Sequence, residues 1–141
     1  MAIFHLHIKH ISKGNNRSAV AASAYCSGSK LMEEVVDKNT GLKFEIAHNY
    51  SNKKGVVFSA IFAPEKASLW MKDREALWNL VQNRFDTRKN ASYAQEIDIA
   101  LPIELSVEEN KELLSEFVEE VLVSEGMVAD VNIHLDNENN P

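Results

Sequence analysis

Hydrophobic and polar residues alternate along several short segments of this chain, which is the pattern of half-buried β-strands. The alternation is clear in residues 1–9, 94–101 and 127–135, and residues 56–62 form a β-branched and aromatic run that ends before Pro64. In each alternating segment aliphatic side chains share one face and polar side chains the other, as antiparallel strands with one wet face do.

Helical patterns separate these segments. Residues 18–27 are rich in alanine between a candidate N-cap and a glycine stop, residues 68–85 carry an apolar stripe, and residues 106–124 begin with a capping box. Residues 30–55 are polar and are expected to form a loop with a short hairpin at residues 43–46. The pattern predicts an α+β fold: a mostly antiparallel sheet of about four or five strands with helices packed on one face.

Length and composition limit the kind of protein. The chain of 141 residues fits one domain with a substantial core, residues 1–141. No apolar run approaches the ~20 residues that cross a bilayer, and the N-terminus does not follow the pattern of a signal peptide. A single cysteine, Cys26, excludes an internal disulfide and favours a cytoplasmic location without membrane insertion.

The charge is distributed unevenly along the chain. The net charge is −6, but residues 1–95 hold 14 Lys and Arg against 8 Asp and Glu, and residues 96–141 hold 1 against 13. The first part is therefore net +6 and the second net −12. This asymmetry allows a basic surface for a polyanion, while the acidic residues concentrate on the helix at residues 106–124. An interaction of that acidic helix with another protein has little support, because such faces are usually only solvated.

Tyr25 stands among side chains too small to bury its ring, in the stretch Ser23-Ala24-Tyr25-Cys26-Ser27-Gly28-Ser29. One interpretation is a tyrosine that packs the helix against a sheet, where aromatic rings gain most from burial. The other is a phenol presented to a ligand that must come close. Cys26 is an alternative nucleophile, although a lone thiol is more often a small hydrophobic residue.

The polar strand faces collect residue types that bind metals or transfer protons, where a solvated face usually carries Lys, Thr, Glu and Arg. The residues in question are His5, His7 and Lys9; Glu96 and Asp98; and Asp130, Asn132 and His134. A tyrosine phenol needs a nearby base or cation to act as a nucleophile near neutral pH, and this face is a candidate source of both. A purely solvated face remains the alternative.

With these residues in place, the sequence resembles the N-terminal relaxase domain of the MobA/MobL family of plasmid mobilization proteins, in the HUH endonuclease group. The resemblance runs essentially the full length. Its matching segments are residues 3–6, 17–25, 27–29, 73–79, 88–91, 96–97, 100–102, 126–130 and 133–134.

The resemblance implies site- and strand-specific nicking and rejoining of DNA at a plasmid transfer origin. Tyr25 matches the family's nucleophile, which keeps a 5′-phosphotyrosine bond, and His134 matches the first of three histidines that bind a divalent metal, Mn²⁺ or Mg²⁺. Glu96 is the candidate base or supporting group. Asp98, His5 and His7 are weaker supporting candidates. The implied partners are single-stranded or hairpin origin DNA, accessory mobilization proteins and a coupling protein. DNA contacts are expected from Lys13, Arg17, Lys53, Lys54, Arg88 and Lys89.

The sequence departs from the family pattern in two places. The family continues past an Asn-Pro into a His-x-His that supplies two metal ligands, whereas here Asn140-Pro141 is the end. The relaxase domain is therefore expected to be incomplete, to bind metal weakly and to be inactive as it stands. Cys26 also replaces a common arginine. The alternative function is a non-catalytic module that binds origin DNA.

Overall fold

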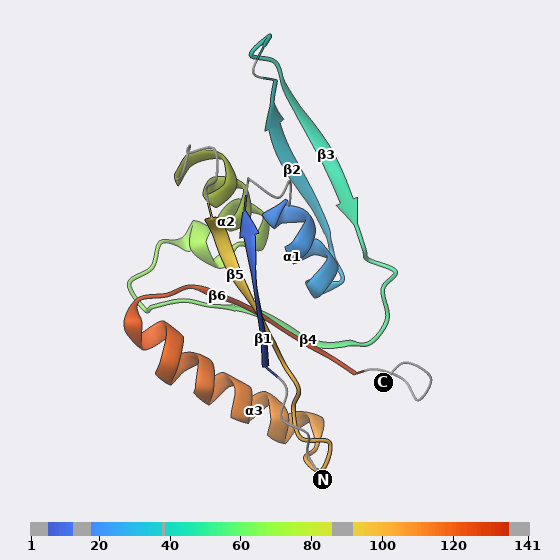
Figure 1. Ribbon diagram of the computed structural model, residues 1–141, viewed down its shortest axis with the longest axis vertical. Coiled ribbons are helices and arrows are strands. Elements are labelled where there is room, and N and C mark those ends of the chain that lie inside the picture. The colour runs from blue at the N-terminus through green and yellow to red at the C-terminus, as the bar shows by residue number, and fades with distance from the viewer. Residues whose placement is uncertain (1–5, 13–17, 38, 86–91, 136–141) are drawn as a thin grey trace.

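The computed structural model describes residues 6–12, 18–37, 39–85 and 92–135 (Figure 1). Strands and helices follow one another along the chain. They are β1 (Leu6–Ser12), α1 (Ala19–Ser27), β2 (Lys30–Val36), β3 (Lys43–Asn49), β4 (Val56–Phe62), α2 (Arg74–Leu80), β5 (Ser92–Ile99), α3 (Val107–Phe117) and β6 (Ala129–His134). A 3₁₀ turn, Leu69–Lys72, precedes α2, and π-helical turns at Val81–Phe85 and Val118–Leu122 extend α2 and α3.

All strand pairs in the described residues are antiparallel, and they join strands far apart in the sequence. β1 pairs with β5, β4 pairs with β6, and β2 and β3 form a hairpin that extends away from the rest of the molecule, at the opposite end from α3 (Figure 1). The predicted α+β class with antiparallel pairing is confirmed. The six described strands lie in three pairs.

The hairpin is longer than the sequence indicated. Residues 30–36 were expected in a loop, but Leu31 and Glu33 face inward from β2. The alternation was not recognised because the inward position of Glu33 holds a charged residue, and charged residues are rarely buried unless they are paired. Glu33 accepts hydrogen bonds from Ser18 at 2.6 Å and Gln82 at 2.8 Å, and His48 lies 2.8 Å away. These contacts join the start of α1, the hairpin and the end of α2.

Helix α1 has the predicted limits. The Ser18 hydroxyl accepts the amide of Ala21 at the N-terminus, and Gly28 ends the helix in the left-handed conformation at φ 63°. The fully buried Val20 and Ala24 pack with residues of β2 and α2. The small residues of this helix therefore allow close packing.

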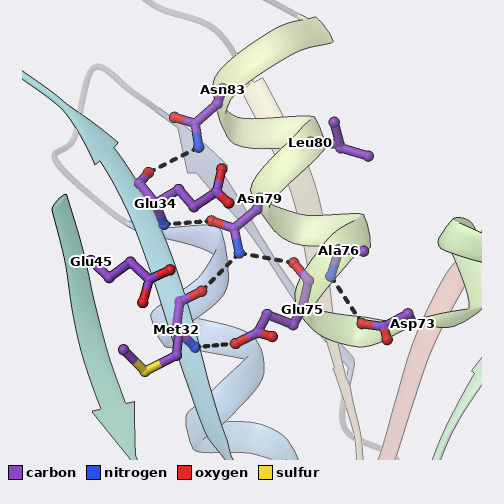
Figure 2. Close-up of a pocket in the computed structure, with 9 residues that line it drawn as sticks. All are labelled: Met32, Glu34, Glu45, Asp73, Glu75, Ala76, Asn79, Leu80 and Asn83. Carbon is purple, nitrogen blue, oxygen red and sulfur yellow. Dashed lines mark hydrogen bonds between the residues drawn. The ribbon is translucent and has the colours of Figure 1, made fainter. Parts of the chain in front are cut away.

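One edge of β2 is completed by side chains of α2 instead of another strand (Figure 2). The Glu75 carboxylate accepts the amide of Met32, and the Asn79 amide group donates to the Met32 carbonyl and accepts the amide of Glu34, both at 2.8 Å. Asn83 donates to the Glu34 carbonyl at 3.0 Å. A four-residue step along the helix matches a two-residue step along the strand, so consecutive edge groups are satisfied.

Some apolar faces stay open within the described residues. Leu6 and Ile8 of β1 are about half exposed, and Ile97, opposite Ile8, is 37% exposed. Apolar side chains of α3 and its extension are also partly exposed: Val118 is buried, but Phe117 is 41% exposed. No helix in the described part of the chain is long and apolar enough to cross a membrane.

The edge contact between α2 and β2 gives a stability prediction. Asn79 is 8% exposed and makes part-buried hydrogen bonds to both Met32 and Glu34, so Asn79→Ala leaves the Met32 carbonyl and the Glu34 amide without these partners. We expect the free energy of unfolding in urea to fall by about 2–3 kcal/mol. Asn83→Ala removes one exposed hydrogen bond and should cost less than about 1 kcal/mol. Equal losses in the two variants would contradict the proposed role of Asn79.

Candidate functional site

Tyr25 lies near the C-terminal end of α1 and projects from the helix with 53% of its surface exposed. Its neighbours on the helix, Ala24 and Ser27, are buried, so the helix packs through small side chains and leaves the phenol outside. The interpretation of Tyr25 as a ring packed between helix and sheet is therefore wrong. The phenol is accessible to a ligand.

The segment between β3 and β4 holds the ring of Tyr25. The Lys53 ammonium nitrogen lies 3.6 Å from the ring centroid and also donates to the Tyr25 carbonyl at 2.8 Å. Tyr50 makes an edge-to-face contact, with ring centroids 5.3 Å apart at 89°. A cation over the face and an aromatic ring at right angles are both favourable arrangements for a tyrosine.

Polar side chains of β5 and β6 also contact the tyrosine helix. Asp130 of β6 accepts a hydrogen bond from Ser23, and His134 Nε2 donates to the Cys26 carbonyl at 2.7 Å. Glu96 of β5 lies against Cys26, with Oε1 3.9 Å from Sγ. The structure therefore brings Glu96 and His134 together at the residue that follows Tyr25.

Asp130 is the main structural contact of this region; the sequence placed it on the polar face of the last strand but assigned it no role. Its side chain is 8% exposed and forms a two-pronged ion pair with Arg74, with the shortest distance 2.8 Å. Trp78 donates to it at 2.8 Å and Asn132 at 3.0 Å. The signal was present in the sequence, because Asp130 shares a face of β6 with Asn132 and His134.

The β1–β5 pair aligns the remaining polar candidates. His7 lies opposite Asp98, and Lys9 lies opposite Glu96. Lys9 is 4.0 Å from Asp98 in an exposed ion pair. The supporting roles of His7 and Asp98 stay predictions.

Several predicted site residues lie outside the described residues. They are His5, Lys13, Arg17, Arg88 and Lys89. Of the predicted DNA contacts, Lys53 and Lys54 are described, and both precede Gly55 in the segment that contacts the tyrosine helix.

Cys26 is a poor candidate for the nucleophile. Burial, and then the negative charge of Glu96, raise the pKa of its thiol to about 11 from an ordinary value of 9.0. Lys53 acts in the opposite direction but does not outweigh them. The thiol is therefore protonated near neutral pH, and thiols react as thiolates.

A divalent metal would need more ligands than the described residues bring together. Because a carbonyl oxygen can only accept, the bond to Cys26 puts the proton of His134 on Nε2 and leaves the Nδ1 lone pair for a metal. Within the described residues no group of three or more His, Cys, Asp or Glu side chains is arranged to hold an ion. The residues at His134 do not by themselves fit a metal site.

A hollow lies elsewhere, between α2 and the β2–β3 hairpin (Figure 2). Its volume is about 460 Å³, and its lining includes the four carboxylates of Glu34, Glu45, Asp73 and Glu75. These charges repel phosphates, so the hollow does not suit a nucleic acid. We place the candidate site at Tyr25, on chemical grounds.

The chain belongs to the MobA/MobL family, whose sequence model matches residues 17–141. One solved structure comes from work on the molecular basis of vancomycin resistance transfer in Staphylococcus aureus. It superimposes on this chain with a TM-score of 0.80 at 41% identity, and the match covers 99% of this chain and 66% of the other.

Curated relatives share the family and are longer. The conjugal transfer protein TraA of Rhizobium radiobacter is 34% identical over 151 aligned positions, which cover 100% of this chain and 13% of TraA. The mobilization protein MobL of Acidithiobacillus ferridurans is 37% identical over 134 positions, covering 95% of this chain and 32% of MobL. This chain therefore corresponds to a minor part of each relative's length.

The ion pair of Asp130 is expected to dominate the stability of the site. Asp130→Asn leaves the charge of Arg74 buried without a partner, which typically costs about 3–5 kcal/mol. The matched control is Asp98→Asn, whose partner Lys9 is exposed and whose cost should stay below about 1 kcal/mol. Urea unfolding of the two variants measures the difference, and a mild effect of Asp130→Asn would refute the assigned role.

The raised pKa of Cys26 predicts a slow thiol. At pH 8 its thiolate fraction should be about a hundredfold lower than that of a thiol with pKa 9.0. Alkylation by iodoacetamide should be slow in the native chain and should keep rising up to about pH 11, because the thiolate forms only there. The urea-unfolded chain is the control and should level off near pH 9. Equal native and unfolded rates at pH 8 would contradict the prediction.

Proposed function

We propose that this chain is the tyrosine-bearing part of a relaxase that nicks and rejoins one DNA strand at a plasmid transfer origin. Membership of the MobA/MobL family, and relatives named for conjugal transfer and mobilization, support a role in DNA mobilization. The observation that carries the proposal is the half-exposed phenol of Tyr25. It projects from a helix whose Ser23 hydroxyl donates a hydrogen bond to the carboxylate of Asp130.

The proposed step is a transesterification. The Tyr25 oxygen attacks the phosphorus of a DNA phosphodiester, and a new phosphorus–oxygen bond to tyrosine forms. The bond from phosphorus to the 3′-oxygen breaks, and the 3′-end leaves as a hydroxyl, so the phenol proton is balanced by the proton on the leaving group. The 5′-phosphate stays on Tyr25. Because the ester keeps the bond energy, attack by a 3′-hydroxyl reverses the step and rejoins the strand.

Glu96 is the proposed base or supporting group. It contacts Cys26, the residue after the nucleophile, and it lies opposite Lys9 across the β1–β5 pair. This position is close enough to influence the end of the tyrosine helix.

A divalent ion, Mn²⁺ or Mg²⁺, is the proposed cofactor of the complete protein, with His134 as one ligand. Such an ion would polarise the phosphate oxygens. In the described residues no group of three or more His, Cys, Asp or Glu side chains is arranged to hold the ion. The roles given above for Tyr25 and Glu96 therefore do not depend on it.

The proposed substrate is single-stranded or hairpin DNA at the transfer origin. Lys53 and Lys54 stand at the tyrosine helix, and the net charge of +6 over residues 1–95 is suited to a phosphate backbone. Accessory mobilization proteins and a coupling protein are proposed as further partners of the complete protein in the cytoplasm.

The proposal is tested by trapping the covalent adduct. In the complete product of the gene that encodes these residues, origin DNA with Mn²⁺ should give a DNA–protein band resistant to denaturant, and Tyr25→Phe should abolish it because the attacking oxygen is gone. Tyr50→Phe is the matched control: it keeps the ring that contacts Tyr25 and should keep the adduct. Chelation by EDTA tests the metal separately.

A non-catalytic DNA-binding module is the second candidate, because no group of three or more His, Cys, Asp or Glu side chains in the described residues is arranged to hold an ion. The same assay separates the two functions. Salt-sensitive binding of origin DNA without any adduct in the complete protein would establish the binding module. An adduct that survives Tyr25→Phe would instead show that another residue is the nucleophile.

A further inference from the structure

We infer that Lys53 is a positioning residue for Tyr25: it fixes the phenol for in-line attack, beyond any contact that it makes with DNA. This inference rests on the proposed function of Tyr25 as the nucleophile. It follows from the way in which one segment, residues 50–55, holds a side chain that is otherwise half exposed.

Lys53 contacts Tyr25 at two points. Its ammonium group lies over the ring, 3.6 Å from the centroid, and donates a hydrogen bond to the backbone carbonyl of the same residue at 2.8 Å. The ammonium group has three donors, so these contacts leave one donor for a phosphate oxygen. A cation that bridges the ring and the backbone of one tyrosine restricts the torsion angles between them.

Tyr50 supplies a second contact with the same ring. Its ring meets that of Tyr25 at 89°, and its carbonyl accepts the amide of Lys53 at 2.9 Å. An exposed tyrosine would otherwise sample several rotamers, and ordering it when substrate binds costs entropy. The contacts of Lys53 and Tyr50 order the ring before DNA binds, so less entropy is lost when it binds. This is expected of a nucleophile that must attack phosphorus in line.

The segment itself is fixed to the end of the tyrosine helix. The amide of Tyr50 donates to the Ser29 carbonyl at 3.0 Å, and the amide of Leu135 donates to the Gly55 carbonyl at 2.7 Å. Gly55 has φ 95°, and a Cβ there would meet the Leu135 carbonyl at 2.9 Å. A Cβ on Gly28 would lie 3.1 Å from Val56, so the helix end and the segment are in close contact. The position of Lys53 is therefore set by backbone contacts on both sides.

Lys54 provides a matched control. It is adjacent to Lys53, carries the same charge and is exposed, and it has no described contact with the ring of Tyr25. A lysine that serves only to attract phosphate should behave like Lys54, whereas a positioning residue should not.

The first experiment measures the contact in the 141-residue chain and does not depend on activity. In a sample with isotope-labelled lysine, the Lys53 ε-methylene protons should be shifted upfield by the ring current of Tyr25. The shift should persist in Tyr25→Phe, disappear in Tyr25→Leu and be absent at Lys54. Lys53 protons at their random-coil position in the unsubstituted chain would overturn the inference.

The second experiment separates positioning from DNA binding in the complete gene product. At saturating origin DNA, Lys53→Met should slow single-turnover adduct formation by about tenfold or more. Lys54→Met, which removes a proposed DNA contact, should weaken DNA binding but slow adduct formation at saturation less than Lys53→Met. Lys66→Met, at an exposed lysine outside the proposed DNA contacts, should leave that rate unchanged. Lys53→Arg, which keeps a cation able to stack on the ring, should recover most of the rate.

The outcomes of these experiments are distinct. Normal rates at saturation for Lys53→Met would overturn the positioning role and leave a phosphate contact. If Tyr25→Phe still forms the adduct, the proposed function fails, while the ring-current shift would still report whether Lys53 holds the ring.

Discussion

The tyrosine helix depends on one buried carboxylate. Asp130 binds Arg74 and Trp78 of α2 and Ser23 of α1 at once, so two helices and strand β6 are held in a fixed relation by a single side chain. Such an ion pair adds little net stability by itself, because taking charges out of water is costly. Its effect is geometric: every donor has a defined direction, and alternative packings leave a charge unpaired. The placement of Tyr25, two residues after Ser23, follows from that constraint.

A similar arrangement holds the hairpin. Glu33 is buried among polar partners from the start of α1 and the end of α2, and Glu75 and Asn79 replace a neighbouring strand along β2. Polar side chains of α2 thus organise both the helix and the hairpin around it. Asp73 caps α2, and the residues after it contact the carboxylate of Asp130 and the edge of β2.

The parts of the fold with local signals were predicted well. Residues 56–62 were placed correctly as a strand because β-branched residues and a following proline act locally, and α1 was placed by its two caps. The strand at residues 30–36 was missed because the buried charge of Glu33 breaks the pattern on which such predictions rely. Tyr25 was chosen as a candidate site residue because its neighbours are small. The contact with Lys53 could not be foreseen, since it depends on how a turn of residues 50–55 folds back on a helix end.

The two ends of the candidate site are far apart along the chain, since Ser23 and Asp130 are separated by 107 residues. Chains are synthesised from the N-terminus, so α1 leaves the ribosome long before the strand that anchors it. While the intervening residues are made, the nucleophile's helix lacks its polar support, and a short helix of this length is marginal in water. The polar site can therefore be assembled only once β6 has been made, so the tyrosine is not presented in its final position on a nascent chain.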